Sequence, residues 1–315
     1  MMTRALRVAR HHLNDRTRDL LDKELTAAVC DIELDSDAHE AILAGIGAHA
    51  LQTHLPGEIL QALTFYPATG SHVLAIGNLP QQEFPATPRD GFTDEPAMAV
   101  TNALHFGLLQ LLSLTPFAVD YENTGRYIRN VAPNPAAAGT TSSWGADSEF
   151  SWHTDNPHLP FGGKGVDPRR YVPRYLSFYA VRNDEQVPTE VLAIEEAVAA
   201  LDETTVQELQ SAQFTVGPPA STDETAPLRD TALLEQSYEG TRARFDRGTV
   251  TPNTPAATAA LDRWVRALDQ ARSEAFVLRP GDFLIFDNYR VLHRRRAFRP
   301  GPADTARWLR RCYAS

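Results

Sequence analysis

The stretch EFSWHTD, residues 149–155, reads as the end of a β-strand and sets the expectations for the rest of the chain. Side chains alternate between the two faces of a strand, so His153 and Asp155 lie on the same face. An imidazole and a carboxylate presented together are natural ligands for a borderline divalent metal ion. Pro157 bends the chain before His158, so we expect His158 to support the loop and not to bind the metal.

A third ligand has to come from elsewhere in the chain, because an HxD tripeptide occurs by chance in many proteins. His293 is the candidate, since it follows a tight turn (279–282), a buried strand (283–288) and a short loop. Two histidines and one carboxylate leave three coordination positions open, which suits non-haem Fe(II) and O₂ chemistry. The other histidines have no local metal-site context, and we expect them on the surface or in the core: His11, His12, His39, His49, His54, His72 and His105.

The segment RWLRRCY (307–313) predicts a strand that carries two arginines on one face. Alternation places Arg307 and Arg311 together and turns Arg310 to the other face, where we expect solvent. An arginine in a partly buried strand is unfavourable unless it meets an anion. Because the planar guanidinium suits a carboxylate, the pair indicates two carboxylates, or one carboxylate and one phosphate.

These pieces together resemble the clavaminate synthase-like branch of the Fe(II)/2-oxoglutarate-dependent dioxygenases, which is related to the taurine dioxygenases (TauD/TfdA). In this pattern 137 residues separate HTD from the last histidine, and an arginine lies fourteen residues beyond it. The N-terminal third is similar only in general character. The matching segments lie between residue 120 and the C-terminus: ENTGRYIRNVAP (122–133), FSWHTD (150–155), PTEVLAIEEAVAAL (188–201), GDFLIFDNYRVLHRRRAF (281–298) and RWLRRC (307–312).

The resemblance implies a fold and a set of site residues. The implied fold is α+β, with a double-stranded β-helix (jelly roll) core, a helical N-terminal layer and inserted helices. The implied iron ligands are His153, Asp155 and His293. The other implied roles are Arg307 for the distal carboxylate of 2-oxoglutarate, Thr189 assisting it, Arg311 for a substrate carboxylate, Glu122 or Asn123 for a substrate amino group, and Asp246 for a cationic substrate side chain.

The chain also departs from the pattern of this branch. Many members carry HTE with a second histidine six residues after the first, whereas this chain has HTD, with His158 five residues after His153. The loop LPFGGKGVDPRR (159–170) looks longer than usual and lines the substrate side, so the substrate stays open. Thr189 has an alternative role as a helix N-cap.

The organisation of the chain predicts one domain over residues 1–315, with a mainly helical layer over 1–115 and the jelly-roll core over 120–315. Helical periodicity and capping residues predict helices at 14–30, 37–51, 94–114, 189–212 and 256–272. An apolar run predicts a buried strand at 72–80, and short runs rich in β-branched and aromatic residues predict further strands beyond residue 126. Mobile or solvated loops are expected at 134–148, 217–227 and 294–296.

The composition limits the classes of partner. The formal net charge of −10 and the pI of about 5.5 disfavour nucleic acid and anionic membranes as partners. We expect neither a membrane-spanning segment nor a signal peptide, because the chain has no apolar run of the required length. Cys30 and Cys312 form no metal-binding or disulfide pattern, so a reduced, cytoplasmic protein is the simplest interpretation.

The expected activity is hydroxylation of an unactivated C–H, at Cβ or Cγ, of a free amino acid or similar small polar metabolite. Fe(II), 2-oxoglutarate and O₂ would take part, and succinate and CO₂ would be released. Desaturation or cyclisation by the same iron centre is an alternative, because these outcomes depend on substrate placement. A catalytically silent jelly-roll binding protein and a zinc hydrolase are alternatives from other classes. Halogenation is disfavoured, because Asp155 keeps the carboxylate that a halogenase replaces.

Overall fold

The computed structural model describes residues 6–30, 32, 39–140, 142–162, 167–219, 222–223 and 226–315. Several segments discussed above lie partly outside these ranges: residues 37–38, 141, 163–166, 220–221 and 224–225. None of the helices in the described part of the chain combines the length and apolar character needed to cross a membrane.

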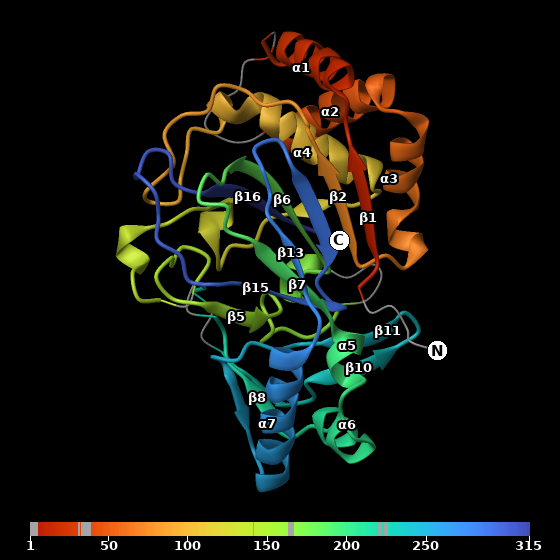
Figure 1. Ribbon diagram of the computed structural model, residues 1–315, viewed down its shortest axis with the longest axis vertical. Helices are drawn as coiled ribbons and strands as arrows, with labels where there is room; N and C mark the ends of the chain where they lie inside the picture. Colours follow the sequence, from red (N-terminus) through yellow and green to blue (C-terminus); the bar gives the residue numbers. More distant parts are fainter. Residues whose placement is uncertain are drawn as a thin grey trace.

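Two sheets, antiparallel except for one pair of strands, form the centre of the molecule (Figure 1). In order, the larger sheet contains β1 (Val8–His12), β2 (Val73–Gly77), β14 (Phe283–Asp287), β6 (Tyr175–Arg182), β16 (Trp308–Ala314) and β3 (Pro116–Phe117), with β4 (Ile128–Val131) also paired to β16. The β1–β2 pair is parallel. The smaller sheet contains β13 (Glu274–Phe276), β7 (Thr189–Ala193), β15 (Val291–Arg295) and β5 (Phe150–His153).

The two sheets share an apolar core. Phe178, Leu284 and Leu309 of the larger sheet belong to the same buried cluster as Val191 and Val291 of the smaller one. Apolar side chains from facing sheets fill the space between them, as expected for a jelly roll. The two packed sheets are the jelly-roll core that the resemblance implied, and strands β5 and β15 lie at one edge of the smaller sheet.

Four helices cover the outer face of the larger sheet: α1 (Asp15–Cys30), α2 (Glu40–His54), α3 (Gly57–Thr69) and α4 (Ala99–Leu111). Their apolar residues form one cluster with outward-facing residues of the sheet, including Tyr179 and Trp308. Helices α2 and α4 approach closely at two glycines. A Cβ on Gly47 would lie 1.7 Å from the carbonyl oxygen of Ala103, so only glycine fits there.

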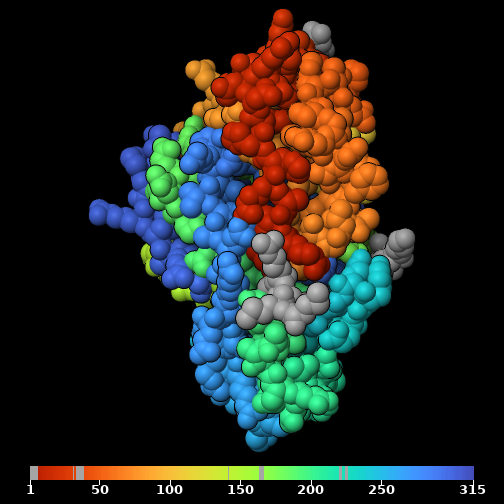
Figure 2. Space-filling view, turned by 45° about the vertical axis from the view of Figure 1, so that its right-hand side comes forward, coloured from red at the N-terminus to blue at the C-terminus, as the bar shows by residue number. Residues whose placement is uncertain are grey.

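A smaller lobe extends from the other end of the molecule. It consists of the hairpin β10 (Leu234–Ser237) and β11 (Gly240–Ala243), the three-stranded sheet β8 (Phe214–Val216), β9 (Leu228–Thr231) and β12 (Val250–Pro252), and the helices α5 (Ile194–Val198), α6 (Glu203–Leu209) and α7 (Pro255–Gln270). Trp264 and Phe245 lie in its separate apolar core. Figure 2 shows this green-to-blue lobe as the narrow end, opposite the red and orange N-terminal helices.

Several sequence expectations about secondary structure are wrong. The helix predicted over 189–212 is divided into strand β7, α5 and α6, so Thr189 lies in a strand and is no helix N-cap. The run VLAI is buried on all sides, and a short apolar run of this kind is equally compatible with a strand or a helix. Strand β1 and helix α3 were not anticipated. The predicted helix at 94–114 is shorter, as a 3₁₀ turn (Pro96–Met98) followed by α4.

Two expectations about arginines are also wrong. Arg310 is fully buried, because helices cover the face of β16 that was expected to meet solvent. Its guanidinium pairs with Glu95 at 2.5 Å and donates to Asn102 and Asn130. The run 294–296 is no solvated loop, since β15 ends at Arg295 and that side chain is buried.

Candidate iron centre and its surroundings

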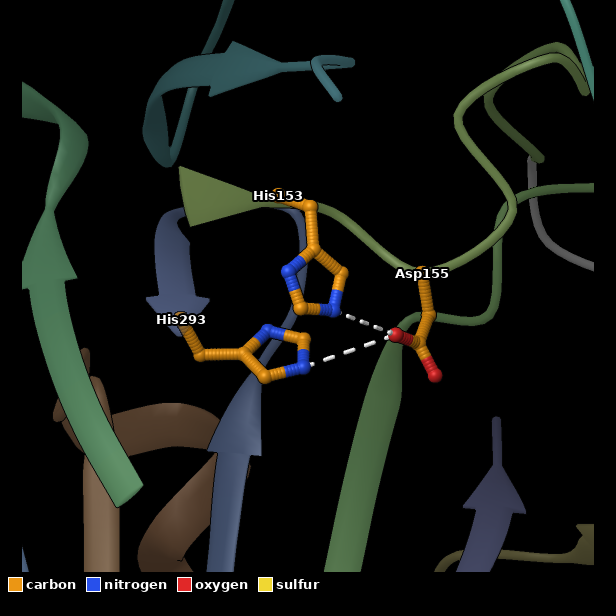
Figure 3. A group of neighbouring side chains, drawn as sticks. All are labelled: His153, Asp155 and His293. Carbon is orange, nitrogen blue, oxygen red and sulfur yellow. Dashed lines mark ion pairs between the residues drawn. The ribbon is translucent and has the colours of Figure 1, made fainter. Parts of the chain in front are cut away.

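His153, Asp155 and His293 converge at the edge of the smaller sheet. His153 is the last residue of β5, and Asp155 lies two residues later. His293 pairs with His153 in the register of β5 with β15. The Nε2 atoms of His153 and His293 lie 3.3 and 3.4 Å from Oδ1 of Asp155. Figure 3 shows both rings pointing at this carboxylate oxygen. All three residues are buried, and their ligand atoms lie within 4.8 Å of one another.

Local contacts fix the direction of the ligands. Nδ1 of His153 lies 2.7 Å from the carbonyl oxygen of Ser151, to which it donates, and this leaves the Nε2 lone pair for a metal. The ring of Phe150 stacks on His153 with centroids 3.6 Å apart. The backbone N–H of Asp155 donates to Oδ1 of Asn288 at 3.1 Å. The triad is therefore held in a defined orientation by neighbouring groups.

The electrostatics of the site favour the protonation states that bind metals. Burial alone would raise the pKa of Asp155, but the charge of Arg311 and the contacts with both histidines hold it well below its usual range. Burial, with the nearby His153, lowers the pKa of His293 to about 4. At neutral pH the site thus offers an ionised carboxylate and a neutral imidazole from His293.

The outer oxygen of Asp155, Oδ2, belongs to a buried network of charges. Arg311 donates to it at 2.8 Å and to Oε1 of Glu122 at 2.9 Å. The hydroxyl of Tyr313 lies 3.1 Å from the same Oδ2 and 2.8 Å from Oε2 of Glu122. Arg129 also pairs with Glu122, at 3.0 Å. Burial would lower the pKa of Arg311, but Glu122, Tyr313 and Asp155 outweigh it and raise the pKa above its ordinary value.

Arg307 lies directly before β16 and lines the same cavity as Arg311, but its surroundings are different. It is 4% exposed, and among the described residues no carboxylate lies within 4.0 Å of its guanidinium. Nη2 reaches Oγ1 of Thr189 at a long 3.4 Å. Burial and the charge of Arg295 lower the pKa of Arg307 to about 9. A buried guanidinium without an anion fits the distal carboxylate of 2-oxoglutarate.

The remaining predicted residues lie at different distances from this cavity. Asn123 donates through Nδ2 to the carbonyls of Arg126 and Ile128, so it shapes the turn after Glu122. Asp246 forms an isolated backbone bridge with His153, while its Oδ1 accepts from the N–H of Gly248. Its side chain is not among those that line the cavity. His158 is buried, with its ring centroid 6.4 Å from that of Tyr121.

Sequence reasoning missed two groups that shape the site. The first is Tyr313, whose alternation with Arg311 along β16 would have placed it on the same face. The second is Arg295, which donates to the carbonyl oxygens of Ser142, Gly145 and Ser148. This side chain ties the polar segment 142–148, expected to be a mobile loop, to the end of β15.

Residues 89–313 match the family described as "Taurine catabolism dioxygenase TauD, TfdA family". The chain belongs to this family. This TauD/TfdA-family protein is an Fe(II)- and 2-oxoglutarate-dependent dioxygenase, and His153, Asp155 and His293 supply the donor set that such an iron centre requires. A curated relative, enduracididine beta-hydroxylase from Streptomyces hygroscopicus, is 27% identical over 294 residues, covering 82% of this chain and 81% of the relative.

Solved structures with the same fold cover almost the whole of this TauD/TfdA dioxygenase. Asparagine oxygenase, in a complex with Fe(II), 3-hydroxyasparagine and succinate, has a TM-score of 0.81 at 19% identity, covering 96% of this chain and 92% of that one. The non-heme iron oxygenase OrfP, in a complex with Fe and alpha-ketoglutaric acid, has a TM-score of 0.79 at 21% identity, covering 96% and 93%. At this level of identity the likeness shows the jelly-roll fold.

Proposed function

We propose that this dioxygenase hydroxylates a free amino acid at Cβ or Cγ, converting 2-oxoglutarate and O₂ to succinate and CO₂. One observation carries the proposal: a buried His-Asp-His triad shares a cavity with one unpaired arginine and one arginine already placed beside a carboxylate. The unpaired Arg307 can bind the carboxylate of a 2-oxoacid. Arg311 lies beside Glu122, so an amino acid there can contact both a cation and an anion.

The names of similar proteins support an amino acid as substrate. The curated relative is a beta-hydroxylase of enduracididine. The asparagine oxygenase structure holds 3-hydroxyasparagine, and one structure of OrfP holds (3S)-hydroxy-L-Arg together with succinate. These amino acids differ in side-chain charge but share the carboxylate and amino group. We infer that the shared groups are bound in the same way here and that the side chain distinguishes the members.

Each residue near the cavity receives one role. His153, Asp155 and His293 hold the iron, and Arg307, assisted by Thr189, holds the distal carboxylate of 2-oxoglutarate. Bound iron and 2-oxoglutarate supply the oxidising power that breaks an unactivated C–H bond. The chain itself excludes water and holds the target carbon close to the metal. The three metal ligands, Arg307 and Arg311 all line this one cavity.

The amino-acid end of the substrate binds at the buried network. The substrate carboxylate takes a hydrogen bond from Arg311, and the amino group meets Glu122. Both side chains are buried and 2.9 Å apart, so one amino acid can reach both. Asn123 supports the turn that presents Glu122. Asp246 is the candidate contact for a cationic substrate side chain, because its backbone is bridged to that of His153.

We further propose that residues 1–315 act as one domain, in which the helices within 1–115 brace the jelly-roll core over 120–315. The shared apolar cluster of these helices with the larger sheet supports this proposal. Free thiols at Cys30 and Cys312 support a location in the reducing cytoplasm.

The test begins with anaerobic titration of the apoprotein with Fe(II) and 2-oxoglutarate, followed by visible absorption. We expect the weak charge-transfer band of an iron–2-oxoacid chelate, lost in His153→Ala and weakened in Arg307→Ala. Arg299→Ala removes an exposed guanidinium and is the matched control. A panel containing neutral, acidic and basic amino acids is then assayed for succinate and for a product one oxygen heavier. Metal binding without the band would overturn the proposal.

A further inference from the structure

The hydroxyl of Tyr313 lies between the amino-acid end of the site and the metal end. It is 2.8 Å from Oε2 of Glu122 and 3.1 Å from Oδ2 of Asp155. Two neighbours hold the ring: Phe117 stacks with it at a centroid distance of 5.9 Å, and the Arg311 guanidinium lies over it at 4.3 Å. The phenol therefore stays in place while its hydrogen bond can change partner.

A phenol has one hydrogen to donate, so only one of the two carboxylates can receive it at a time. The Nδ2 group of Asn156 lies 3.3 Å from the same oxygen and donates to it. Glu122 has two other donors, Arg311 and Arg129. Oδ2 of Asp155 has only Arg311 besides the phenol among the described contacts. Loss of the phenol hydrogen bond therefore removes a larger share of the hydrogen bonds to Asp155 Oδ2 than of those to Glu122.

The two carboxylate oxygens of Asp155 have different partners. Oδ1 faces both histidine Nε2 atoms, whereas Oδ2 faces Arg311 and Tyr313. A carboxylate whose outer oxygen is engaged binds a metal through the other oxygen alone. Single-point ligation keeps three positions open, and a 2-oxoacid with O₂ needs all three. Partners outside the ligand set commonly control metal affinity in this way.

We propose that Tyr313 is a positioning residue that couples amino-acid binding at Glu122 to the way in which Asp155 holds the iron. This inference rests on the proposed function. The ammonium group of the substrate places a positive charge beside the Glu122 carboxylate. This charge makes Glu122 a weaker acceptor for the phenol hydrogen of Tyr313. The hydrogen then turns to Oδ2 of Asp155, and the carboxylate is held through Oδ1 when the substrate is in place.

The first test uses Tyr313→Phe, which keeps the stacked ring and removes the hydroxyl. Co(II) titration without substrate is expected to show metal affinity weakened about tenfold or more. With 2-oxoglutarate and the best amino acid, we expect the ratio of hydroxylated product to succinate to fall about tenfold or more, as for the loss of one hydrogen bond to a charged group. The dissociation constant of the amino acid should change less than about threefold.

The decisive readout is the charge-transfer band of the anaerobic Fe(II)–2-oxoglutarate protein. In the wild type, the amino acid should shift this band, and in Tyr313→Phe the shift should shrink although the amino acid still binds. Glu122→Gln removes the competing charge, so its substrate-free band should move toward the substrate-bound position. An equal shift in the wild type and Tyr313→Phe overturns the coupling. The absence of a shift with any amino acid in the wild type instead counts against the proposed function.

The matched control is Tyr66→Phe. Tyr66 is also buried, but its hydroxyl donates to the carbonyl oxygen of His72, away from the metal ligands. This variant should lose as much thermal stability as Tyr313→Phe while its metal affinity and product ratio stay at the wild-type values. Equal changes in both variants would mean that Tyr313 has only a structural role.

Discussion

Arg307, directly before β16, and Arg311, within it, line the same cavity and are both buried, yet their surroundings are opposite. Arg311 has carboxylate oxygens of Asp155 and Glu122 at 2.8 and 2.9 Å. Arg307 has no carboxylate within 4.0 Å in the described part of the chain, and its pKa is lowered to about 9. An unpaired buried guanidinium marks a place where the ligand supplies the anion, whereas a paired one belongs to the protein's own charge balance.

The comparison predicts different binding behaviour at the two ends of the cavity. A carboxylate that arrives at Arg307 forms a new ion pair without breaking one. A carboxylate that arrives at Arg311 must share a guanidinium that already serves Asp155 and Glu122. We therefore expect 2-oxoglutarate to bind more tightly than the amino acid, and to bind before it.

The largest expected effect is a difference in protein stability between variants of the two arginines. Arg311→Met leaves Glu122 and Asp155 buried without their shared cation, so we expect the free energy of unfolding of the metal-free protein to fall by about 3–5 kcal/mol. Arg307→Met removes a buried charge that has no partner, so it should leave stability unchanged or raise it. Urea unfolding of both apoproteins measures the difference. Equal destabilisation by the two substitutions would contradict the difference between a paired Arg311 and an unpaired Arg307.

The next effect concerns affinity for 2-oxoglutarate. Arg307→Met should weaken it about 10- to 100-fold, because charge-assisted hydrogen bonds contribute about 1.5–3 kcal/mol. Isothermal titration with Mn(II) in place of iron measures this without turnover. Arg299→Met, at an exposed position, should leave the affinity at the wild-type value. A loss below threefold would mean that another group binds the distal carboxylate.

A smaller effect appears as a dependence of stability on pH. The pKa of His293 is about 4 in the folded protein against 6.5 as its ordinary value, because of burial and the nearby His153. The unfolded chain therefore binds more protons, and stability should fall by about 1 kcal/mol between pH 6.5 and 5.5 from this residue. His293→Gln should reduce the slope of unfolding free energy against pH, measured on the metal-free protein. An unchanged slope would contradict the lowered pKa.

The smallest effect concerns Asp246, which does not line the cavity. If the substrate side chain is cationic, Asp246→Ala should weaken its binding about threefold, as for an exposed ion pair. Neutral amino acids should bind equally to both proteins. Unchanged affinity for basic amino acids would remove Asp246 from the site.

The sequence predicted that His153, Asp155 and His293 converge, because strand alternation at 153–155 is local and the distant His293 follows a recognisable turn and strand. It failed at Arg310, since alternation separates two faces but does not tell which elements cover each of them. It also failed at 189–193, where a strand buried on both sides lacks the alternation that marks a half-exposed one. Tyr313 shares a face with Arg311, but only the folded chain places Glu122 beside both.

The pairing of His153 with His293 across β5 and β15 has a mechanical consequence. Strand β5 has only four residues, lies at the edge of its sheet, and its register with β15 shifts between His293 and Arg295. A metal bound by both histidines is a cross-link between these strands. Asp155, as a third ligand, connects the residues directly after β5 to the same metal. Loading the site should therefore slow amide hydrogen exchange across residues 150–155, so that this edge reports occupancy without any catalytic turnover.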